Sequence, residues 1–252
     1  MLYTAAHHAN EWITALVLLK FAEDLAAAAE AGETLFGYDA RTLLEESTIH
    51  MVPMVDPDGV DLVTGALRPG DPQYEQAKAI SESFPEIPFP EGWKANLLGV
   101  DLNLQYPAGW LQAREIKFSQ GFTRPAPRDY VGRAPLSQAE TIGLASYTER
   151  IDPALVLAYH TQGAEIYWQF EGNAPAGAQA LGEEFARVSG YTLAQVAEQS
   201  AYAGYKDWFI KLFDRPGYTI EAGRGTNPLP LSQFDEIYRD NLGILVTAAR
   251  GM

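Results

Sequence analysis

The chain has 252 residues, 47% of them hydrophobic, and carries a formal net charge of −15 at pH 7. Its length fits one large α/β domain or two small ones, and we expect one domain over residues 1–252. The hydrophobic fraction suits a globular protein with a sizeable core. The acidic charge argues against a nucleic-acid partner, because a phosphate backbone requires a basic surface.

The chain contains no cysteine, so disulfides and thiolate chemistry are excluded and any metal must be bound by histidines and carboxylates. The N-terminus shows no basic stretch followed by an apolar core, so no signal peptide is predicted. The longest apolar run, residues 13–19, is far too short to span a bilayer. We therefore expect a cytoplasmic protein without a membrane partner.

The first hundred residues are predicted to begin with a buried strand at residues 2–6 and a long helix from Glu11 to Gly32. Apolar positions recur with helical period in this helix, and Gly32 is a good stop. The elements predicted next are a helix at 39–46, a strand at 48–55, a turn at 56–59 and a mostly irregular segment to residue 98. A loop of this length in a compact domain is usually functional.

The rest of the chain alternates strands with helices. Strands are predicted at residues 99–103, 154–159, 165–170 and 217–221. Helices are predicted at residues 137–150, 176–188, 192–199 and 232–249, the first and last with caps at Ser137 and Ser232. The alternation predicts a doubly wound mixed sheet with helices on both faces. In such folds the functional site lies beyond the carboxyl ends of the strands.

Three residues at predicted strand ends carry the chemistry. His8 and Glu11 lie on either side of one strand-to-helix turn, and His160 follows the apolar run 155–159. Two histidines and a glutamate are a known ligand set of catalytic zinc, whose fourth tetrahedral position stays open for water. We therefore predict a Zn²⁺ site at His8, Glu11 and His160.

Five segments, in the same order, resemble the zinc metallocarboxypeptidase family, and within it the bacterial γ-D-glutamyl–diamino acid endopeptidases that cut cell-wall peptides. The segments are His8-Ala9-Asn10-Glu11-Trp12, Asp56-Pro57-Asp58-Gly59, Trp93-Lys94-Ala95-Asn96 with Gly99-Val100-Asp101-Leu102-Asn103, Tyr159-His160-Thr161-Gln162-Gly163, and Asp207-Trp208 with Tyr218-Thr219-Ile220-Glu221. Any one segment is a modest signal, but five in order across nearly the whole chain are highly specific.

The resemblance implies roles for residues outside the ligand set. Glu221 corresponds to the catalytic glutamate, a general base and then acid. Lys94 corresponds to the family's oxyanion-stabilising arginine and keeps its charge without the guanidinium fork. Asn96, Asn103 and Lys206 are the expected substrate contacts. The alternatives are a strand-end surface carboxylate for Glu221 and an ordinary solvated lysine for Lys94.

Two other histidines are not predicted to bind the metal. Adjacent strand residues point to opposite faces, so only one of His7 and His8 reaches it. The register of the resembling motif favours His8, which leaves His7 packing or hydrogen-bonding behind the ligands. His50 has no comparable context and is predicted to be structural.

Two positions bear on specificity. Carboxypeptidases of the family have an arginine directly after the asparagine of the Asp-x-Asn segment, where it binds the substrate's terminal carboxylate. Here that position is Leu104, which cannot make the bidentate contact; the endopeptidase branch also lacks the arginine. Lys206 stands just before Asp207. In the family, the residue at this position helps to set side-chain specificity, and a cation there suits a diaminopimelate carboxylate.

Two further departures from the family concern a tyrosine and the N-terminus. The family's mobile catalytic tyrosine falls at Gln199, and Tyr202 and Tyr205 are alternatives between which spacing does not decide. Family members usually have a further N-terminal portion before the metal motif, whereas this chain begins seven residues before His8. The sheet is therefore expected to expose an edge. A homo-oligomer that covers it, a truncated gene model or a separate upstream domain would each account for this.

We therefore expect a zinc-dependent metallopeptidase that hydrolyses γ-D-glutamyl–diaminopimelate bonds in peptidoglycan-derived peptides, with a cell-wall muropeptide as its partner. One alternative is a metallocarboxypeptidase that releases C-terminal residues. A second is a catalytically impaired binder of wall peptides. Zinc acylases, which share the ligand pattern, are a third.

Overall fold

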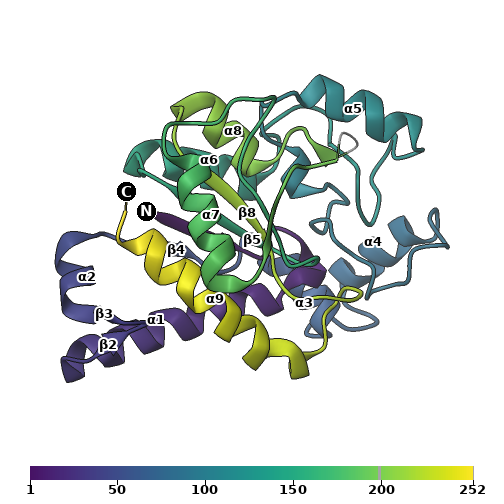
Figure 1. Cartoon of the computed structure of the whole chain (residues 1–252). Coiled ribbons are helices and arrows are strands. Elements are labelled where there is room, and N and C mark those ends of the chain that lie inside the picture. The colour runs from purple at the N-terminus through teal and green to yellow at the C-terminus, as the bar shows by residue number, and fades with distance from the viewer. Residues whose placement is uncertain (198–199, 252) are drawn as a thin grey trace.

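The computed structural model describes residues 1–197 and 200–251 (Figure 1). The strands are β1 (Leu2–Ala5), β2 (Thr34–Leu35), β3 (Tyr38–Asp39), β4 (His50–Val52), β5 (Val156–His160), β6 (Glu165–Tyr167), β7 (Thr192–Ala194) and β8 (Gly217–Glu221). The helices are α1 (Ile13–Ala31), α2 (Ala40–Glu46), α3 (Pro57–Thr64), α4 (Pro72–Ser81), α5 (Trp110–Ser119), α6 (Ala139–Ile151), α7 (Ala178–Ser189), α8 (Tyr205–Phe213) and α9 (Phe234–Ala249). Short 3-10 turns at Ala9–Glu11 and Leu102–Leu104 lie near the strand ends.

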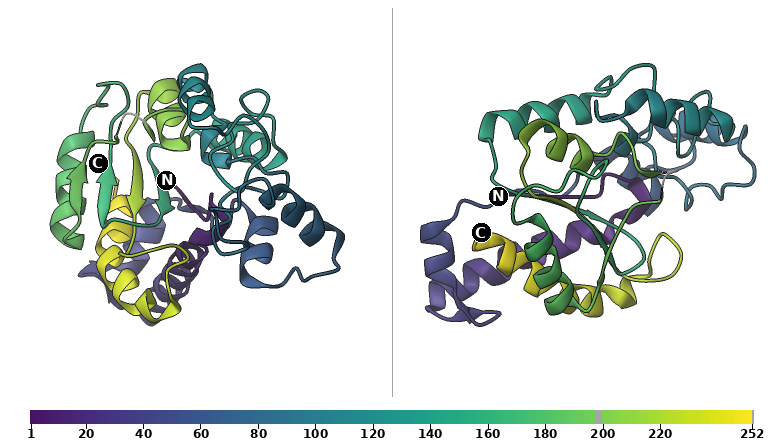
Figure 2. Two further views of the ribbon diagram at one scale, coloured as in Figure 1. Left: turned by 90° about the vertical axis from the view of Figure 1, so that its right-hand side faces the viewer. Right: turned by 45° about the horizontal axis from the view of Figure 1, so that its top comes forward.

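A six-stranded mixed sheet forms the centre of the molecule, in the order β4-β1-β5-β8-β6-β7. All neighbouring pairs are parallel except β6 and β8, which are antiparallel. Helices cover both faces, as the turned views in Figure 2 show. The predicted doubly wound α/β fold with a mixed sheet is confirmed.

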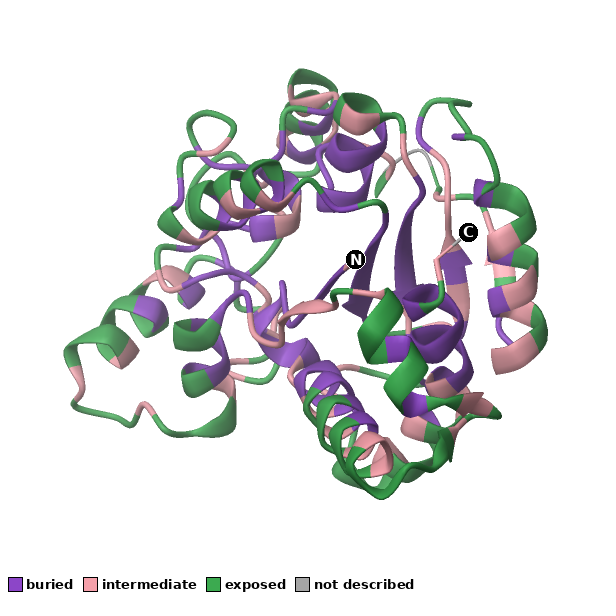
Figure 3. Ribbon diagram, turned by 90° about the vertical axis from the view of Figure 1, so that its left-hand side faces the viewer, coloured by how far each residue is buried: buried purple, intermediate pink, exposed green. Residues whose placement is uncertain are grey.

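The two faces of the sheet bury different sets of side chains. Tyr3, Leu157 and Tyr218 point to one face, where they pack with residues of α1, α7 and α9. Leu2 and Val156 point to the other, where they pack with residues of α6 and α8. This alternation follows from the period of two along a strand. Both faces are covered, so the central strands are buried along their length (Figure 3).

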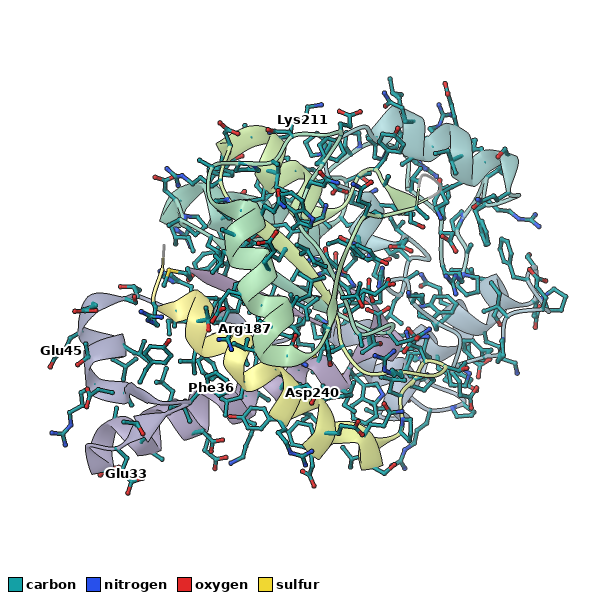
Figure 4. All side chains as sticks on the ribbon, viewed as in Figure 1. Glu33, Phe36, Glu45, Arg187, Lys211 and Asp240 are labelled. Carbon is teal, nitrogen blue, oxygen red and sulfur yellow. The ribbon has the colours of Figure 1, made fainter. Side chains whose placement is uncertain are left out.

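The exterior is acidic and charged. Glu33, Glu45 and Lys211 are among the exposed charged residues that project from the ribbon in Figure 4. No helix within the described residues is long and apolar enough to cross a membrane. The small β2–β3 hairpin packs against α9, because a Cβ built on Gly243 would come within 2.7 Å of Phe36 Cζ.

The first α/β unit forms as predicted, with one shorter strand. Gly32 ends α1 with φ +70°, and Asp39 Oδ1 caps α2 by accepting from Thr42 N at 2.7 Å. The strand predicted at 48–55 is regular only at β4. Its chain nevertheless continues beside β1, since Val55 N donates to the Ala5 carbonyl at 3.0 Å.

The turn predicted at 56–59 was wrong, and two helices, α3 and α4, interrupt the segment to residue 98 that was predicted to be mostly irregular. Asp56 is the N-cap of α3, and its Oδ1 accepts from Gly59 N at 3.1 Å. Asp followed by Pro is also typical of a helix start. Asp is a preferred N-cap, and proline at the first helical position lacks only an N–H that would have no partner within the helix. Helix α4 begins in the same way, at Asp71 and Pro72.

Two other elements were assigned to the wrong class. Residues 99–103 form no strand; Asp101 instead caps a 3-10 turn, accepting from Asn103 N at 3.1 Å. Residues 192–194 form β7 rather than a helix, because Thr192 N donates to the Ala164 carbonyl at 2.9 Å and starts pairing with β6. Residues 198–199 of that predicted helix lie outside the described residues.

The predicted caps of two helices were also wrong, although both helices are present. The N-caps are Gln138 for α6 and Gln233 for α9, and neither makes a side-chain cap bond. Ser137 Oγ donates to Gln105 Oε1 at 2.9 Å instead. Predicted helix 176–188 corresponds to α7. Predicted strands 154–159, 165–170 and 217–221 correspond to β5, the shorter β6 and β8.

Candidate active site

The candidate site lies where the parallel strands β1, β5 and β8 end. Beyond β1, His8 precedes a 3-10 turn that contains Glu11. His160 and Glu221 are the last residues of β5 and β8. Because parallel strands end at one edge of a sheet, residues far apart in the sequence meet there.

His8, Glu11 and His160 converge on one point. Nδ1 of His8 lies 3.2 Å from Nδ1 of His160 and 2.9 Å from Glu11 Oε1. His160 Nδ1 lies 2.9 Å from Glu11 Oε2. Zinc with bonds of about 2.0–2.1 Å in a tetrahedron separates its ligand atoms by roughly 3.3 Å. The three side chains, all buried, therefore fit a zinc ion through two imidazole nitrogens and a carboxylate.

Asp101 orients His8 for this role. Its Oδ1 accepts from His8 Nε2 at 3.1 Å, and its Oδ2 accepts from Asp129 N at 3.1 Å. With the proton on Nε2, the lone pair of Nδ1 is free to bind a metal. The family resemblance gave Asp101 no role of its own, because its partner His8 lies 93 positions away in the sequence.

Glu11 is held by three further groups. Lys94 Nζ forms an ion pair with Oε1 at 2.7 Å, and Thr161 N donates to Oε2 at 3.3 Å. Asn227 Nδ2 lies 3.4 Å from Oε1 and also donates to the Thr161 carbonyl at 3.0 Å. Asn227 was not predicted, since its loop after β8 carries no motif.

Neighbouring charges shift the pKa values of the three residues. Burial opposes protonation of His8, but the carboxylates of Glu11 and Asp101 outweigh it and raise the pKa of His8 to about 9. A metal that binds Nδ1 would therefore displace a proton from this ring. Burial lowers the pKa of His160. Burial opposes ionisation of Glu11, yet His8 and Lys94 hold its pKa well below the usual range. Glu11 is therefore a carboxylate at neutral pH, as a metal ligand must be.

The other two histidines lie outside the ligand set. His7 is fully buried, with Nε2 3.3 Å from Tyr106 Oη and its ring stacked on His160 at a centroid distance of 5.4 Å. His50 is the first residue of β4, and its Nδ1 lies 2.8 Å from Tyr147 Oη. His7 thus supports the ligand ring from behind, and His50 has a structural partner.

A cavity of about 660 Å³ opens in front of the ligand set and is lined by His8, Glu11, His160 and Glu221. Burial, together with the negative charge of Glu11, raises the pKa of Glu221 to about 8. The carboxyl group of Glu221 therefore holds a proton far more readily than a surface glutamate does. A carboxyl group with a raised pKa beside a candidate metal-binding cluster is typical of a general acid–base residue.

Of the expected substrate contacts, Asn103 and Lys206 line the cavity and Asn96 does not. Asn96 Oδ1 accepts from Leu98 N and Val100 N, both at 3.1 Å, and its amide donates to Gln138 Oε1 at 3.0 Å. Asn96 thus shapes its own loop, and we do not retain it as a substrate contact.

Asn103 and Lys206 differ in how many of their polar atoms already bond to other groups of the protein. Asn103 Oδ1 accepts from Tyr205 N at 3.0 Å, and its amide nitrogen donates no hydrogen bond within residues 1–197 and 200–251. Lys206 is buried; its ammonium is paired with Asp207 and donates to the Gln169 carbonyl at 2.7 Å. An anion reaching Lys206 therefore meets an existing ion pair.

Leu104 lines the same cavity and is buried, so its position carries no guanidinium. Tyr205 does not replace the family's mobile tyrosine, because it is fully buried and its Oη lies 2.8 Å from Thr148 Oγ1. Tyr202 is not part of the cavity wall and packs on Phe170. Gln199, the family's tyrosine position, lies outside the described residues.

Comparisons with known proteins agree with this geometry. Residues 1–243 match the profile of the zinc carboxypeptidase family Peptidase M14. The chain belongs to this family of zinc metallopeptidases.

Two curated relatives match nearly the whole chain. It is 47% identical over 246 residues to gamma-D-glutamyl-L-diamino acid endopeptidase 1 of Lysinibacillus sphaericus, covering 97% of this chain and 59% of that protein. It is 39% identical over 241 residues to the uncharacterized protein YqgT of Bacillus subtilis (strain 168), covering 96% and 62%. The chain thus spans about 60% of the length of each of these two relatives.

Solved structures share the fold at low identity. Bovine thrombin-activatable fibrinolysis inhibitor superposes with a TM-score of 0.72 at 17% identity, over 99% of this chain and 81% of that one. Murein-tripeptide amidase MpaA from Escherichia coli O157 superposes with a TM-score of 0.58 at 21% identity, over 98% and 80%. The carboxypeptidase-like architecture is therefore shared with both.

Proposed function

We propose that this chain is a zinc-dependent peptidase that hydrolyses γ-D-glutamyl–diamino acid bonds in peptidoglycan-derived peptides. The observation that carries the proposal is the convergence of His8 Nδ1, His160 Nδ1 and the Glu11 carboxylate at the cavity that Glu221 also lines. The choice of bond follows the relative from Lysinibacillus sphaericus, a named gamma-D-glutamyl-L-diamino acid endopeptidase.

His8, Glu11 and His160 would hold the zinc ion. Bound there, zinc supplies Lewis acidity toward the scissile carbonyl and the attacking water. Asp101 keeps His8 in the tautomer that leaves Nδ1 free, and Asn227 and Thr161 fix the Glu11 carboxylate. The chain thereby supplies both the ligands and the groups that orient them.

Glu221 takes the proton from the attacking water and passes it to the nitrogen of the leaving amine. The raised pKa of Glu221 favours the second step. At neutral pH the carboxyl group keeps the proton taken from water, so it has a proton to donate to the leaving amine. A cation at the neighbouring ligand set would lower that pKa and so favour the first step. One carboxyl group thus serves as base and then as acid.

Lys94 supplies positive charge for the developing oxyanion. Its ammonium lies 2.7 Å from Glu11 Oε1 and lines the cavity, so its charge is fixed beside the reacting carbonyl. Fixed positive charge in a site that excludes water stabilises a developing oxyanion far more than it would in bulk water.

Leu104 and Lys206 account for the choice of substrate. Leu104 offers nothing to a peptide's terminal carboxylate, which disfavours ordinary carboxypeptidase specificity. The free end of a diaminopimelate side chain carries a carboxylate and an ammonium. The Lys206–Asp207 ion pair presents one complementary charge to each of these groups.

Product analysis tests the proposal. The zinc-loaded protein is incubated with L-Ala-γ-D-Glu-meso-diaminopimelate, with its C-terminal amide, and with an ordinary α-linked peptide. We expect release of diaminopimelate or its amide from both forms of the γ-linked peptide and little release of single residues from the α-linked one.

Cleavage of the α-linked peptide that strictly requires a free C-terminal carboxylate would instead establish a carboxypeptidase. No turnover of any of the three would contradict the proposal. Cytoplasmic location and a homo-oligomer over the sheet edge stay predictions.

A further inference from the structure

Among the described residues, four with cationic side chains line the cavity of a chain whose net charge is −15: Lys94, Lys117, Arg128 and Lys206. Each lysine ammonium is paired with a carboxylate. Lys94 pairs with Glu11 at 2.7 Å and Lys117 with Asp129 at 2.6 Å, while Lys206 pairs with Asp207. The charges of these lysines are therefore largely balanced by the protein.

Arg128 differs from these lysines, because its partner carboxylate, that of Asp129, also pairs with Lys117. Its Nε donates to Asp129 Oδ2 at 2.6 Å, while Lys117 takes Oδ1 of the same group. Two cations on one carboxylate leave this cluster with a net positive charge. Within the part of the chain that the structure describes, Nη1 and Nη2 of Arg128 donate no hydrogen bond. They are thus free to bind an anion in the cavity.

The backbone on either side of Arg128 is hydrogen-bonded to the segments that contain or orient the candidate metal ligands. The Pro127 carbonyl accepts from Lys94 N at 2.8 Å and Ala95 N at 2.9 Å. Asp129 N donates to Asp101 Oδ2, and Asp101 Oδ1 holds His8. Arg128 is therefore held from both sides at the wall of the reaction site.

The side chain is accessible yet within electrostatic range of the candidate ligands. It is 44% exposed, so a substrate can reach it. Burial opposes its charge, but Asp129, Asp101 and Glu11 outweigh this and raise the pKa of Arg128. Glu86 and Glu91 are exposed at the rim of the same cavity and repel anions there. Recognition of an anion on this wall thus depends on Arg128.

We propose that Arg128 binds the free α-carboxylate of the D-glutamyl residue whose γ-carbonyl is attacked. The inference rests on the proposed function and names a determinant of its substrate class. In a γ-linked glutamate this carboxylate is about 5 Å from the scissile carbonyl, across C–C bonds of about 1.5 Å. An α-linked peptide continues as main chain from its scissile carbonyl and has no free α-carboxylate there. A guanidinium with both terminal nitrogens free matches the carboxylate in a bidentate contact.

The experiment compares two tripeptides that differ only at this group. One is L-Ala-γ-D-Glu-meso-diaminopimelate, and the other carries the α-amide, D-isoglutamine, in place of the carboxylate. The zinc-loaded proteins are wild type, Arg128→Gln, Arg128→Lys and the control Arg133→Gln, which changes an exposed arginine outside the cavity wall. Steady-state kcat and KM are measured for each pair.

Wild type and Arg133→Gln are expected to prefer the carboxylate by about ten- to a hundredfold in kcat/KM, as for one charge-assisted contact. Arg128→Gln should abolish the preference by raising KM for the carboxylate substrate with little change in kcat, because the contact is made equally in ground and transition states. Arg128→Lys should restore part of it, since charge is kept and the fork is lost.

Three other results would overturn the inference. Equal rates of wild type on the two peptides would leave the proposed function intact and remove this determinant. A preference that survives Arg128→Gln would assign it to another group. A loss of kcat in Arg128→Gln on both peptides alike would give Arg128 an oxyanion or structural role. Failure of wild type to cut either peptide would contradict the proposed function itself.

Discussion

His160 and Glu221 are register partners on the neighbouring parallel strands β5 and β8. A proposed metal ligand and the proposed acid–base residue therefore emerge side by side from the same edge of the sheet. A shift of one residue in either strand would turn one side chain to the opposite face. The ladder of the sheet thus fixes the position of the proposed base relative to the metal.

Glu221→Gln should separate chemistry from metal binding. The amide cannot accept the proton of water, so kcat should fall by about 10²–10⁴-fold while the zinc content stays at the wild-type level. Steady-state kinetics and elemental analysis of the same preparation check this. The control is Glu45→Gln, an exposed change in α2 that should leave kcat near wild type. Near-normal turnover in Glu221→Gln would show that another group is the base.

The same substitution should change how stability depends on pH in chelator-treated protein. Burial and Glu11 raise the pKa of Glu221 from 4.5 to about 8. Folded protein therefore holds a proton that unfolded chain loses, and the stability from this group is lost as pH rises from about 4.5 to 8. Glu221→Gln does not ionise, so its free energy of unfolding relative to wild type should increase from pH 5 to pH 8. Urea titrations at pH 5 and pH 8 measure the difference in free energy of unfolding between the variant and wild type. The same difference at both pH values would show that the pKa of Glu221 is not raised.

Asp101→Asn should weaken zinc binding without removing a ligand. The amide can still meet His8 Nε2 but no longer selects the tautomer with Nδ1 free, and loss of such orienting groups typically costs about 10–100-fold in metal affinity. Competition with a fluorescent chelator measures the affinity. Asp58→Asn, an exposed change in α3, is the matched control. Unchanged affinity in Asp101→Asn would remove Asp101 from this role.

The sheet was largely predictable because its strands are apolar and bounded by clear stops. β8 was predicted with its observed limits, and β1 and β5 within about two residues. Helices α5 and α8 were not predicted, for opposite reasons. α5 buries little beyond Ala113 and Lys117, so it shows no apolar stripe. α8 spans only nine residues and buries its polar residues Lys206 and Asp207 along with its apolar ones, so its short pattern of polar residues does not mark a solvent face.

The candidate ligands were predictable because their chemistry is rare and their motifs are local. His8 and Glu11 are three residues apart, and His160 ends an apolar strand. The orienting contacts were not, since they join segments distant in sequence: Asp101 meets His8 across 93 positions, and Asn227 meets Glu11 across 216. Such pairs are set by the packing of loops, for which the sequence pattern carries no period.

Lys206→Met should remove selection for diaminopimelate at the leaving residue. Wild type should cut diaminopimelate peptides about ten- to a hundredfold faster in kcat/KM than lysine peptides, which lack the second carboxylate. The variant should cut both at similar rates with its zinc retained. Lys211→Met, an exposed change in the same helix, should keep the preference. Equal rates for the two peptides in wild type would exclude this role for Lys206.

Zinc stoichiometry tests the central claim most directly. Wild type, His160→Ala and the control His50→Ala are purified, loaded with zinc, dialysed and measured by elemental analysis, with circular dichroism to verify folding. We predict one zinc per chain in wild type and His50→Ala, because His50 pairs with Tyr147 away from the ligand set. We predict little or none in folded His160→Ala. Equal zinc in all three proteins would contradict the site formed by His8, Glu11 and His160.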